Sequence, residues 1–84
     1  MDKYFRTHNF YLAAFLFTQG MVLANVDRIT DRNRASFVFI DNPDREILIH
    51  AFNYSEEGNE TTLVDARKLV YSIRALKEKL YQNN

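Results

Sequence analysis

The chain contains no cysteine, only two glycines and one proline, and two histidines, which stand far apart at positions 8 and 50. Without cysteine, a disulfide, a thiolate metal site and a cysteine nucleophile are all excluded. The two isolated histidines do not form a metal-ligand set, and we interpret them as surface or capping residues. So few glycines and prolines leave little room for long irregular loops.

The chain also lacks a hydrophobic run that could cross a membrane. Phe10–Phe17 is apolar over about eight residues, whereas a spanning helix needs about 20. Lys3 and Arg6 before this run make it similar to a secretory signal. The absence of cysteine is instead typical of a reducing compartment. We therefore expect a core helix in a cytoplasmic protein that does not contact membranes.

What the chain does contain is apolar surface. Its 84 residues are 46% hydrophobic and 14% aromatic, with seven phenylalanines and five tyrosines. This composition lies well outside the disordered range. The length predicts a single domain over residues 1–84, near the small end of what one hydrophobic core can stabilise.

Charge is balanced in total but not along the chain. The formal net charge is zero, which argues against a protein built to coat nucleic acid. Residues 1–40 carry a net charge of +2, residues 41–65 one of −6, and residues 66–84 one of +4. The acidic middle either neutralises the basic C-terminal block, inside the fold or across a dimer contact, or leaves that block as a basic binding face.

The first half of the chain predicts a helix followed by a hairpin. Thr7 is suited to cap a helix over residues 8–19, and Gly20 stands where a left-handed residue ends a helix. This helix is apolar nearly all the way round, as is typical of a helix buried on several sides. Residues 21–29 and 35–40 are predicted to form two strands joined by a polar turn.

A helix start signal follows at Asn42-Pro43-Asp44, with Asn42 as the cap and proline in the first turn. It predicts a helix to about Tyr54 that buries Ile47, Leu48, Ala51 and Phe52. Alternating apolar residues leave a third strand open as the alternative for residues 45–54.

The C-terminal segment predicts the longest helix. Thr62-x-x-Asp65 matches a capping box, and the helix should run to about Tyr81. Its apolar stripe would consist of Ala66, Leu69, Val70, Ile73, Leu76 and Leu80.

These elements give an α+β fold in the order α-β-β-α-α, a two-stranded antiparallel hairpin packed with three helices. Two strands alone are too few to be stable without cover. The strand at residues 35–40 is apolar on both faces, since Phe37 and Phe39 alternate with Val38 and Ile40. A second chain that extends or covers the hairpin would bury the remaining face. We therefore expect a homodimer or a higher homo-oligomer.

Several short segments together form a familiar pattern: Phe10-Tyr11-Leu12-Ala13-Ala14 followed by Gly20, Phe37-Val38-Phe39, Phe52-Asn53, Val64-Asp65-Ala66-Arg67 and Arg74-Ala75-Leu76-Lys77. Through them nearly the whole chain resembles the small bacterial and phage proteins grouped as domain of unknown function 5659. The loop between Asn53 and Thr61 is longer and more acidic here than in that group. The resemblance implies a fold and a prokaryotic or viral context, but no known activity.

No catalytic set is visible in the sequence. Neither histidine has an obvious serine or aspartate partner, and there is no glycine-rich phosphate loop or metal-ligand spacing. Asp41 and Asp44 are spaced like paired carboxylates, but their position at a helix start explains both. We expect a protein that is not an enzyme and needs no cofactor.

The first candidate binding surface lies on the last helix. At 100° per residue, one flank carries Arg67, Arg74, Lys77 and Tyr81 within about 80°. Arginine offers paired donors to a carboxylate or phosphate, and tyrosine offers a stacking face. This flank is predicted to bind an anionic ligand or an acidic partner. The alternative is a solvated face on which Arg74 pairs with Glu78 and Arg67 meets the acidic loop.

The second candidate is the hairpin tip, where Arg28, Arg32 and Arg34 could contact nucleic acid. The strand with Phe37 and Phe39 is similar to the aromatic strand of RNA-recognition domains, where bases stack on exposed rings. Burial of both rings in the core is the favoured interpretation. A third possibility is a phage accessory protein that sequesters a nucleotide where two chains meet.

Overall fold

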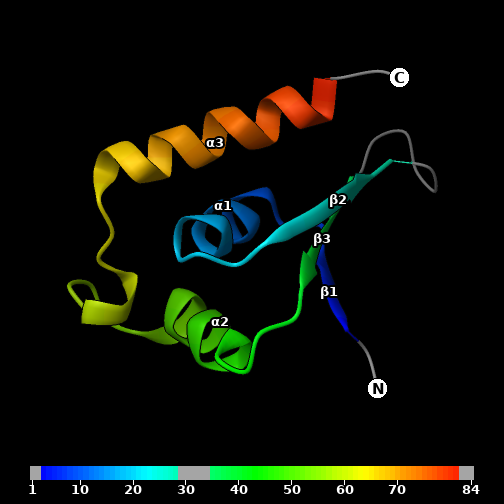
Figure 1. Cartoon of the computed structure of the whole chain (residues 1–84). Coiled ribbons are helices and arrows are strands. Elements are labelled where there is room, and N and C mark those ends of the chain that lie inside the picture. The colour runs from blue at the N-terminus through cyan, green and yellow to red at the C-terminus, as the bar shows by residue number, and fades with distance from the viewer. Residues whose placement is uncertain (1–2, 29–34, 82–84) are drawn as a thin grey trace.

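A computed structural model describes residues 3–28 and 35–81 (Figure 1). Along this part of the chain the elements are β1 (Tyr4–Thr7), α1 (Phe10–Thr18), β2 (Leu23–Asp27), β3 (Ser36–Ile40), α2 (Arg45–Tyr54), the 3-10 turn η1 (Glu60–Thr62) and α3 (Ala66–Tyr81). The three helices lie on the same side of the sheet, and α1 lies between α2 and α3.

The sheet has three antiparallel strands in the order β1-β3-β2, so the prediction of a two-stranded hairpin was wrong. The missed strand is β1, which pairs with β3 in a register that sets Tyr4 opposite Ile40 and Thr7 opposite Phe37. β1 has only four residues, and its partner is more than 25 residues away in sequence. A strand this short shows little periodicity of its own. It is stabilised by hydrogen bonds to residues far away in the sequence, and a local pattern cannot reveal such bonds.

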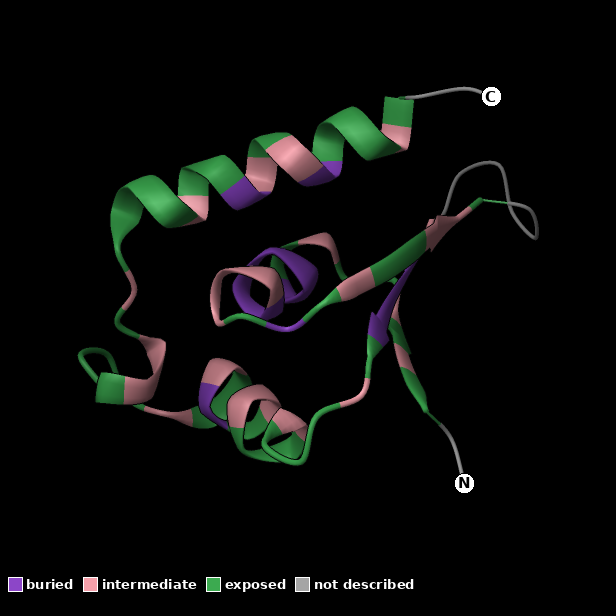
Figure 2. Cartoon of the chain, viewed as in Figure 1, coloured by how far each residue is buried: buried purple, intermediate pink, exposed green. Residues whose placement is uncertain are grey.

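The core forms between the sheet and α1. Phe37 and Phe39 of the central strand are almost completely buried, and Phe5, Leu23 and Val26 of the flanking strands pack beside them. From the other side, five consecutive residues of α1, Leu12–Leu16, are buried (Figure 2). The prediction of a helix buried on several sides is confirmed, and so is the burial of both phenylalanine rings.

Both ends of α1 are fixed by local hydrogen bonds. Asn9 caps the helix by accepting a hydrogen bond from the backbone of Leu12 at 3.1 Å, so the cap lies two residues beyond the predicted Thr7. At the other end Gly20 has a φ of 102°, as its position predicted. The amide of Met21 donates to the carbonyl of Leu16, which closes the helix in a Schellman motif.

The outer face of β3 is closed in a way that the sequence did not indicate. Val38 is only 5% exposed, yet no described element packs over it. Its neighbours across the sheet are Arg6 and Asn25, and Arg6 forms an ion pair of 3.6 Å with Asp27 across the central strand. Polar residues of the flanking strands therefore lie on both sides of Val38. Ile40, at the end of the strand, is 47% exposed.

Residues 45–54 form a helix, so the alternative of a third strand there was wrong. The helix begins later than its start signal suggested, because Asn42 accepts from the amide of Asp44 and forms a turn that leads into α2. Of the four residues predicted to be buried, Ile47 is exposed. The face of α2 that packs on the core is centred between Leu48 and Phe52, which leaves Ile47 at its margin.

α3 is capped by Asp65 rather than by a capping box. The Asp65 carboxylate accepts from the amides of Arg67 and Lys68 at 2.8 and 3.1 Å. Leu69, Ile73, Leu76 and Leu80 pack on the core as predicted, whereas Ala66 and Val70 are exposed. Ser72 takes a buried place instead, with its hydroxyl 2.9 Å from that of Thr18 on α1.

The contact between β3 and α1 predicts a large loss of stability for Phe39→Ala. Removing a fully buried phenylalanine should lower the free energy of unfolding by about 3–5 kcal/mol. Urea unfolding followed by circular dichroism measures this loss. Tyr54→Ala, at a side chain that is 74% exposed, is the control and should cost less than about 1 kcal/mol. Equal losses for the two variants would contradict this assignment of the core.

Candidate functional site

The predicted basic flank forms part of the solvent face of α3. Arg67, Arg74, Lys77 and Tyr81 are all exposed, and none of them faces the α1 side of the helix. Arg67 and Arg74 are two helical turns apart, which separates their backbones by roughly 10 Å along the axis. The structure therefore brings all four predicted residues to one accessible surface.

A fifth residue, Tyr71, belongs to this surface and was missed in the sequence. It is 75% exposed and lies four residues after Arg67 and three before Arg74, so it is a helical neighbour of both. A shallow hollow of about 340 Å³ beside it is lined by Ala66, Arg67, Val70, Tyr71 and Arg74. The spacing of Arg67, Tyr71 and Arg74 at i, i+4 and i+7 places all three on one side of a helix, and this could have revealed Tyr71. The predicted apolar stripe, however, included the neighbouring residue Val70. We call Arg67, Tyr71, Arg74, Lys77 and Tyr81 the basic-aromatic face.

The pairing that would neutralise this face is not formed among residues 3–28 and 35–81. The salt bridges found there join Arg6 to Asp27 and Arg45 to Asp41. Within the same ranges Arg74 forms no salt bridge with Glu78, and Arg67 forms none with the acidic loop. The positive charges of Arg67, Arg74 and Lys77 are thus not offset by a direct ion pair with a described side chain.

The hairpin arginines are only partly described. Arg28 donates a hydrogen bond from its guanidinium to the backbone carbonyl of Leu80, in the last turn of α3. A cation there satisfies a carbonyl that has no partner within the helix. This contact places the base of the hairpin next to the C-terminal end of the basic-aromatic face. Arg32 and Arg34 lie outside the described residues.

Other polar residues that drew attention in the sequence have structural contacts. Nδ1 of His8 lies 3.0 Å from the carbonyl oxygen of Ala35, and His50 is exposed with its ring against Tyr54. Within the described residues there is no group of three or more histidine or carboxylate side chains that could hold a metal ion. Neither His50 nor Asn53 lines the pocket of about 390 Å³ that lies between α2 and α3.

Asp41 and Asp44 do not act as a carboxylate pair. The Asp41 carboxylate accepts from Nε and Nη2 of Arg45 at 3.1 and 3.2 Å. The Arg45 guanidinium also lies 4.7 Å from the centre of the Phe5 ring, a cation-π distance. The hydrogen bonds from Arg45, and then the one from the Asn42 backbone, lower the pKa of Asp41 below its ordinary value. This pair connects the start of α2 to β1.

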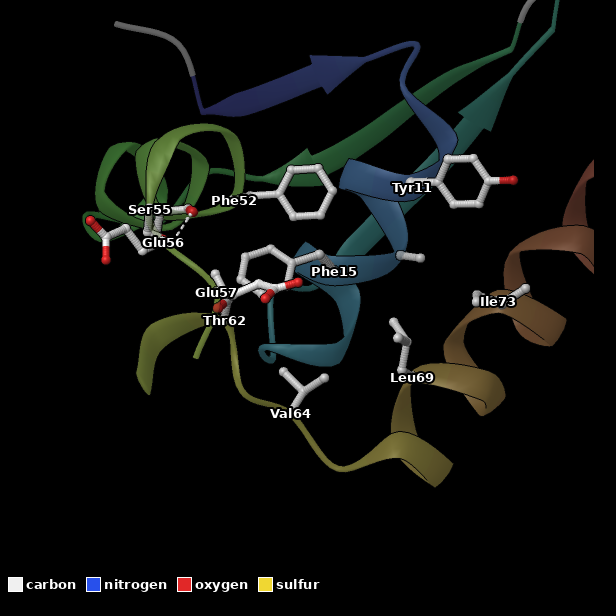
Figure 3. Close-up of a pocket in the computed structure, with 12 residues that line it drawn as sticks. Tyr11, Phe15, Phe52, Ser55, Glu56, Glu57, Thr62, Val64, Leu69 and Ile73 are labelled. Carbon is white, nitrogen blue, oxygen red and sulfur yellow. Dashed lines mark hydrogen bonds between the residues drawn. The ribbon is translucent and has the colours of Figure 1, made fainter. Parts of the chain in front are cut away.

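A separate feature, outside the basic-aromatic face, is a pocket of about 390 Å³. It lies where α2 and α3 diverge on either side of α1, and the linker between α2 and α3 closes one end (Figures 1 and 3). Phe15 and Phe52 meet at its centre with ring centroids 5.1 Å apart, and Leu69 and Ile73 of α3 face them. No sequence pattern indicated this pocket, because its walls come from separate parts of the chain.

Together these features define a small α+β protein with three helices on one side of an antiparallel sheet. The chain belongs to the family described as Domain of unknown function (DUF5659), whose model matches residues 2–82. This match confirms the resemblance seen in the sequence. A search of curated proteins and a search of solved structures found no match. In the described part of the chain, no helix has both the length and the apolar character needed to cross a bilayer.

The Asp41–Arg45 pair predicts a pH dependence of stability. The pKa of Asp41 is lower in the folded protein than its ordinary value of 3.8, so the ionised carboxylate stabilises the folded state above pH 3.8. This stabilisation is lost as the pH falls through the folded-state pKa. Asp41→Asn should therefore be less stable than the wild type at pH 7, and the difference should shrink below pH 3.8. Urea unfolding of both proteins across this range tests the prediction, which fails if the difference does not depend on pH.

Proposed function

We propose that the protein is a small binding module, without catalytic activity, whose basic-aromatic face takes an acidic segment of a partner protein. The observation that carries this proposal is the hollow on α3 between Arg67 and Arg74. It combines two cations that no described carboxylate pairs with and one exposed tyrosine. A surface kept for solubility alone would not need its cations and aromatic rings gathered on one face.

The chemistry of these side chains suits a carboxylate-bearing chain. Each guanidinium can donate two parallel hydrogen bonds to one carboxylate. Two such groups about 10 Å apart match carboxylates several residues apart in a partner segment. Tyr71, between them, can cover the apolar part of the bound segment and donate its hydroxyl, which is how tyrosine contributes at protein interfaces.

Nucleic acid is the second candidate ligand, because Arg28 bonds to the last turn of α3, where the basic-aromatic face ends. Arg28 could extend the positive surface from Lys77 toward the hairpin, where Arg32 and Arg34 follow in sequence. The zero net charge of the chain weighs against this alternative. The rings of Phe37 and Phe39 are buried, so they are not accessible for stacking on bases.

We also propose that the module self-associates through the outer face of its sheet. Tyr4 and Ile40 are opposite each other in the register, and the amide of Ile40 donates to the carbonyl of Val22. The side chains of Tyr4, Val22 and Ile40 are each about half exposed. The three residues form an apolar row across the sheet, and no described element covers it. The row ends at the two edge strands, β1 and β2, whose outer edges are unpaired in the described sheet. A second copy of the chain would bury this row in a two-fold interface.

The charge-reversal variant Arg67→Glu with Arg74→Glu tests the first proposal. A fluorescent peptide of alternating glutamate and glycine, titrated at low salt, should bind the wild type and lose about tenfold or more in affinity with the variant. Lys3→Glu with Lys79→Glu is the matched control, because it makes the same charge change at exposed lysines outside the basic-aromatic face. Equal losses for both variants would mean that net charge alone governs binding, and the proposed face would be rejected.

The same titration separates the alternatives when a single-stranded oligonucleotide or ATP replaces the peptide. Affinity for nucleic acid that falls by decades as salt rises from 50 to 200 mM would favour nucleic-acid binding. Tight binding of ATP with little affinity for the peptide would favour a protein that sequesters nucleotides.

The variant Ile40→Arg tests self-association. Light scattering over a dilution series should show the wild type as a dimer or larger at high concentration, and Ile40→Arg as a monomer throughout. A charge in the centre of the apolar row would be buried without a partner in the interface. Ile47→Arg, at an isoleucine exposed on α2, is the control and should leave the association unchanged. A wild type that is monomeric at every concentration would contradict the proposal.

A further inference from the structure

The pocket between α2 and α3 has properties that the basic-aromatic face does not explain. It lies on the opposite side of α3, where Leu69 and Ile73 form one of its walls. Its volume of about 390 Å³ falls within the range typical of small-molecule sites. Most of the lining is apolar, and the rings of Phe15 and Phe52 contact each other at its centre with a tilt of 32° between their planes.

The hydroxyl groups of Ser55 and Thr62, at the linker end of the lining, can only accept further hydrogen bonds. Ser55 Oγ already donates its hydrogen to the carbonyl of Ala51 at 2.6 Å, and Thr62 Oγ1 donates to that of Asn59 at 2.9 Å. A hydroxyl has one hydrogen to donate, so only the oxygen lone pairs of these two residues remain for a ligand. The hydroxyl of Tyr11 points away from the phenylalanine rings (Figure 3).

The charged groups in the lining have a single sign. Glu56 and Glu57 are the charged residues among those that line the pocket, and none of the others is Lys, Arg or His. In Figure 3 the Glu56 carboxylate points away from the phenylalanine rings, whereas that of Glu57 extends toward them. An ionised carboxylate accepts hydrogen bonds and cannot donate one. The polar side chains at the linker end of the pocket are therefore acceptors, and the charge there is negative.

From this arrangement we propose that the pocket binds a small primary amine with an apolar body. The apolar part lies against Phe15 and Phe52, and the ammonium group donates hydrogen bonds to Glu57 and to the hydroxyl oxygens at the linker end. An ammonium group supplies three donors and a positive charge, which the acceptors and the carboxylate at that end complement. This site is independent of the proposed binding face on the outer side of α3.

The lining disfavours other small ligands and larger occupants. A carboxylate or phosphate ligand would meet Glu57 without a basic partner in the lining. A neutral apolar molecule would leave the Glu57 carboxylate without a new hydrogen bond, so it would bind less tightly than the amine. A partner helix, which is about 10–12 Å in diameter with its side chains, is too wide for a cavity of this volume.

Three matched probes test the inference with the full chain labelled with ¹⁵N. The probes are 4-phenylbutylamine, 4-phenylbutanol and 5-phenylpentanoate, which share a phenyl-alkyl body and differ in the polar end. In an NMR titration at pH 7, the amine should shift amides of residues 51–57, 62–64 and 69–73. It should bind about tenfold more tightly than the alcohol, and the carboxylate should bind most weakly.

Two conservative variants localise the charge effect. Glu57→Gln should weaken binding of the amine about tenfold, because it removes the charge and replaces one acceptor oxygen with an NH2 donor. Binding of the alcohol should change much less, because a hydroxyl can either donate to the remaining amide oxygen or accept from the NH2 group. Glu56→Gln is the matched control, and it should retain most of the preference for the amine. Both side chains are exposed, so neither variant should disturb the fold.

Several results would overturn the proposal. These are equal affinity for the three probes, shifts outside the pocket, an equal loss of amine binding in both variants, or no saturable binding of the amine. Binding of a basic amphipathic peptide to these residues in the absence of amine binding would also overturn it, and would identify the pocket as a protein-docking site.

Discussion

The packing of α1 into the centre of the molecule is the constraint on which the other features depend. This helix is apolar on nearly every side, so it is stable only when it is covered on every side. The sheet covers it with Phe37 and Phe39, while α2 and α3 cover two further sides. Since α2 and α3 both pack on α1 and diverge from each other, a pocket remains between them. One apolar helix therefore accounts for the layered arrangement and for the position of the cavity.

The same constraint determines which side of α3 is available to a partner. Burying Leu69, Ile73 and Leu76 against the core fixes the rotation of the helix about its axis, and this rotation turns Arg67, Tyr71 and Arg74 toward solvent. The hydroxyl contact between Thr18 and Ser72 supports this rotation, because each buried polar group needs its partner. The basic-aromatic face and the pocket are thus opposite sides of one amphipathic helix.

The sheet raises a different question, which is how three short strands can be stable when no element of the described chain covers their outer face. The ion pair between Arg6 and Asp27 joins the two strands that flank β3, and Val38 in the middle of β3 is only 5% exposed. Surface ion pairs stabilise proteins only weakly, so most of the stability of the sheet comes from the face that packs on α1. The apolar row at Tyr4, Val22 and Ile40 remains open, and in our proposal a second copy of the chain meets the sheet there.

Local signals in the sequence are enough to specify several of the elements. Gly20 ends α1, the apolar run forms the core helix, and the central strand and α2 lie close to their expected positions. The 3.6-residue period of α3 also placed its basic residues on the exposed side of the helix. Tertiary structure alone decided the pairing of β1 with β3, the exposure of Ile47 and Val70, and the pocket. Each of these depends on contacts between residues far apart in sequence or on how far a helix turns about its axis. Local propensity depends on only a few neighbouring residues, so it predicts neither long-range contacts nor the rotation of a helix about its axis.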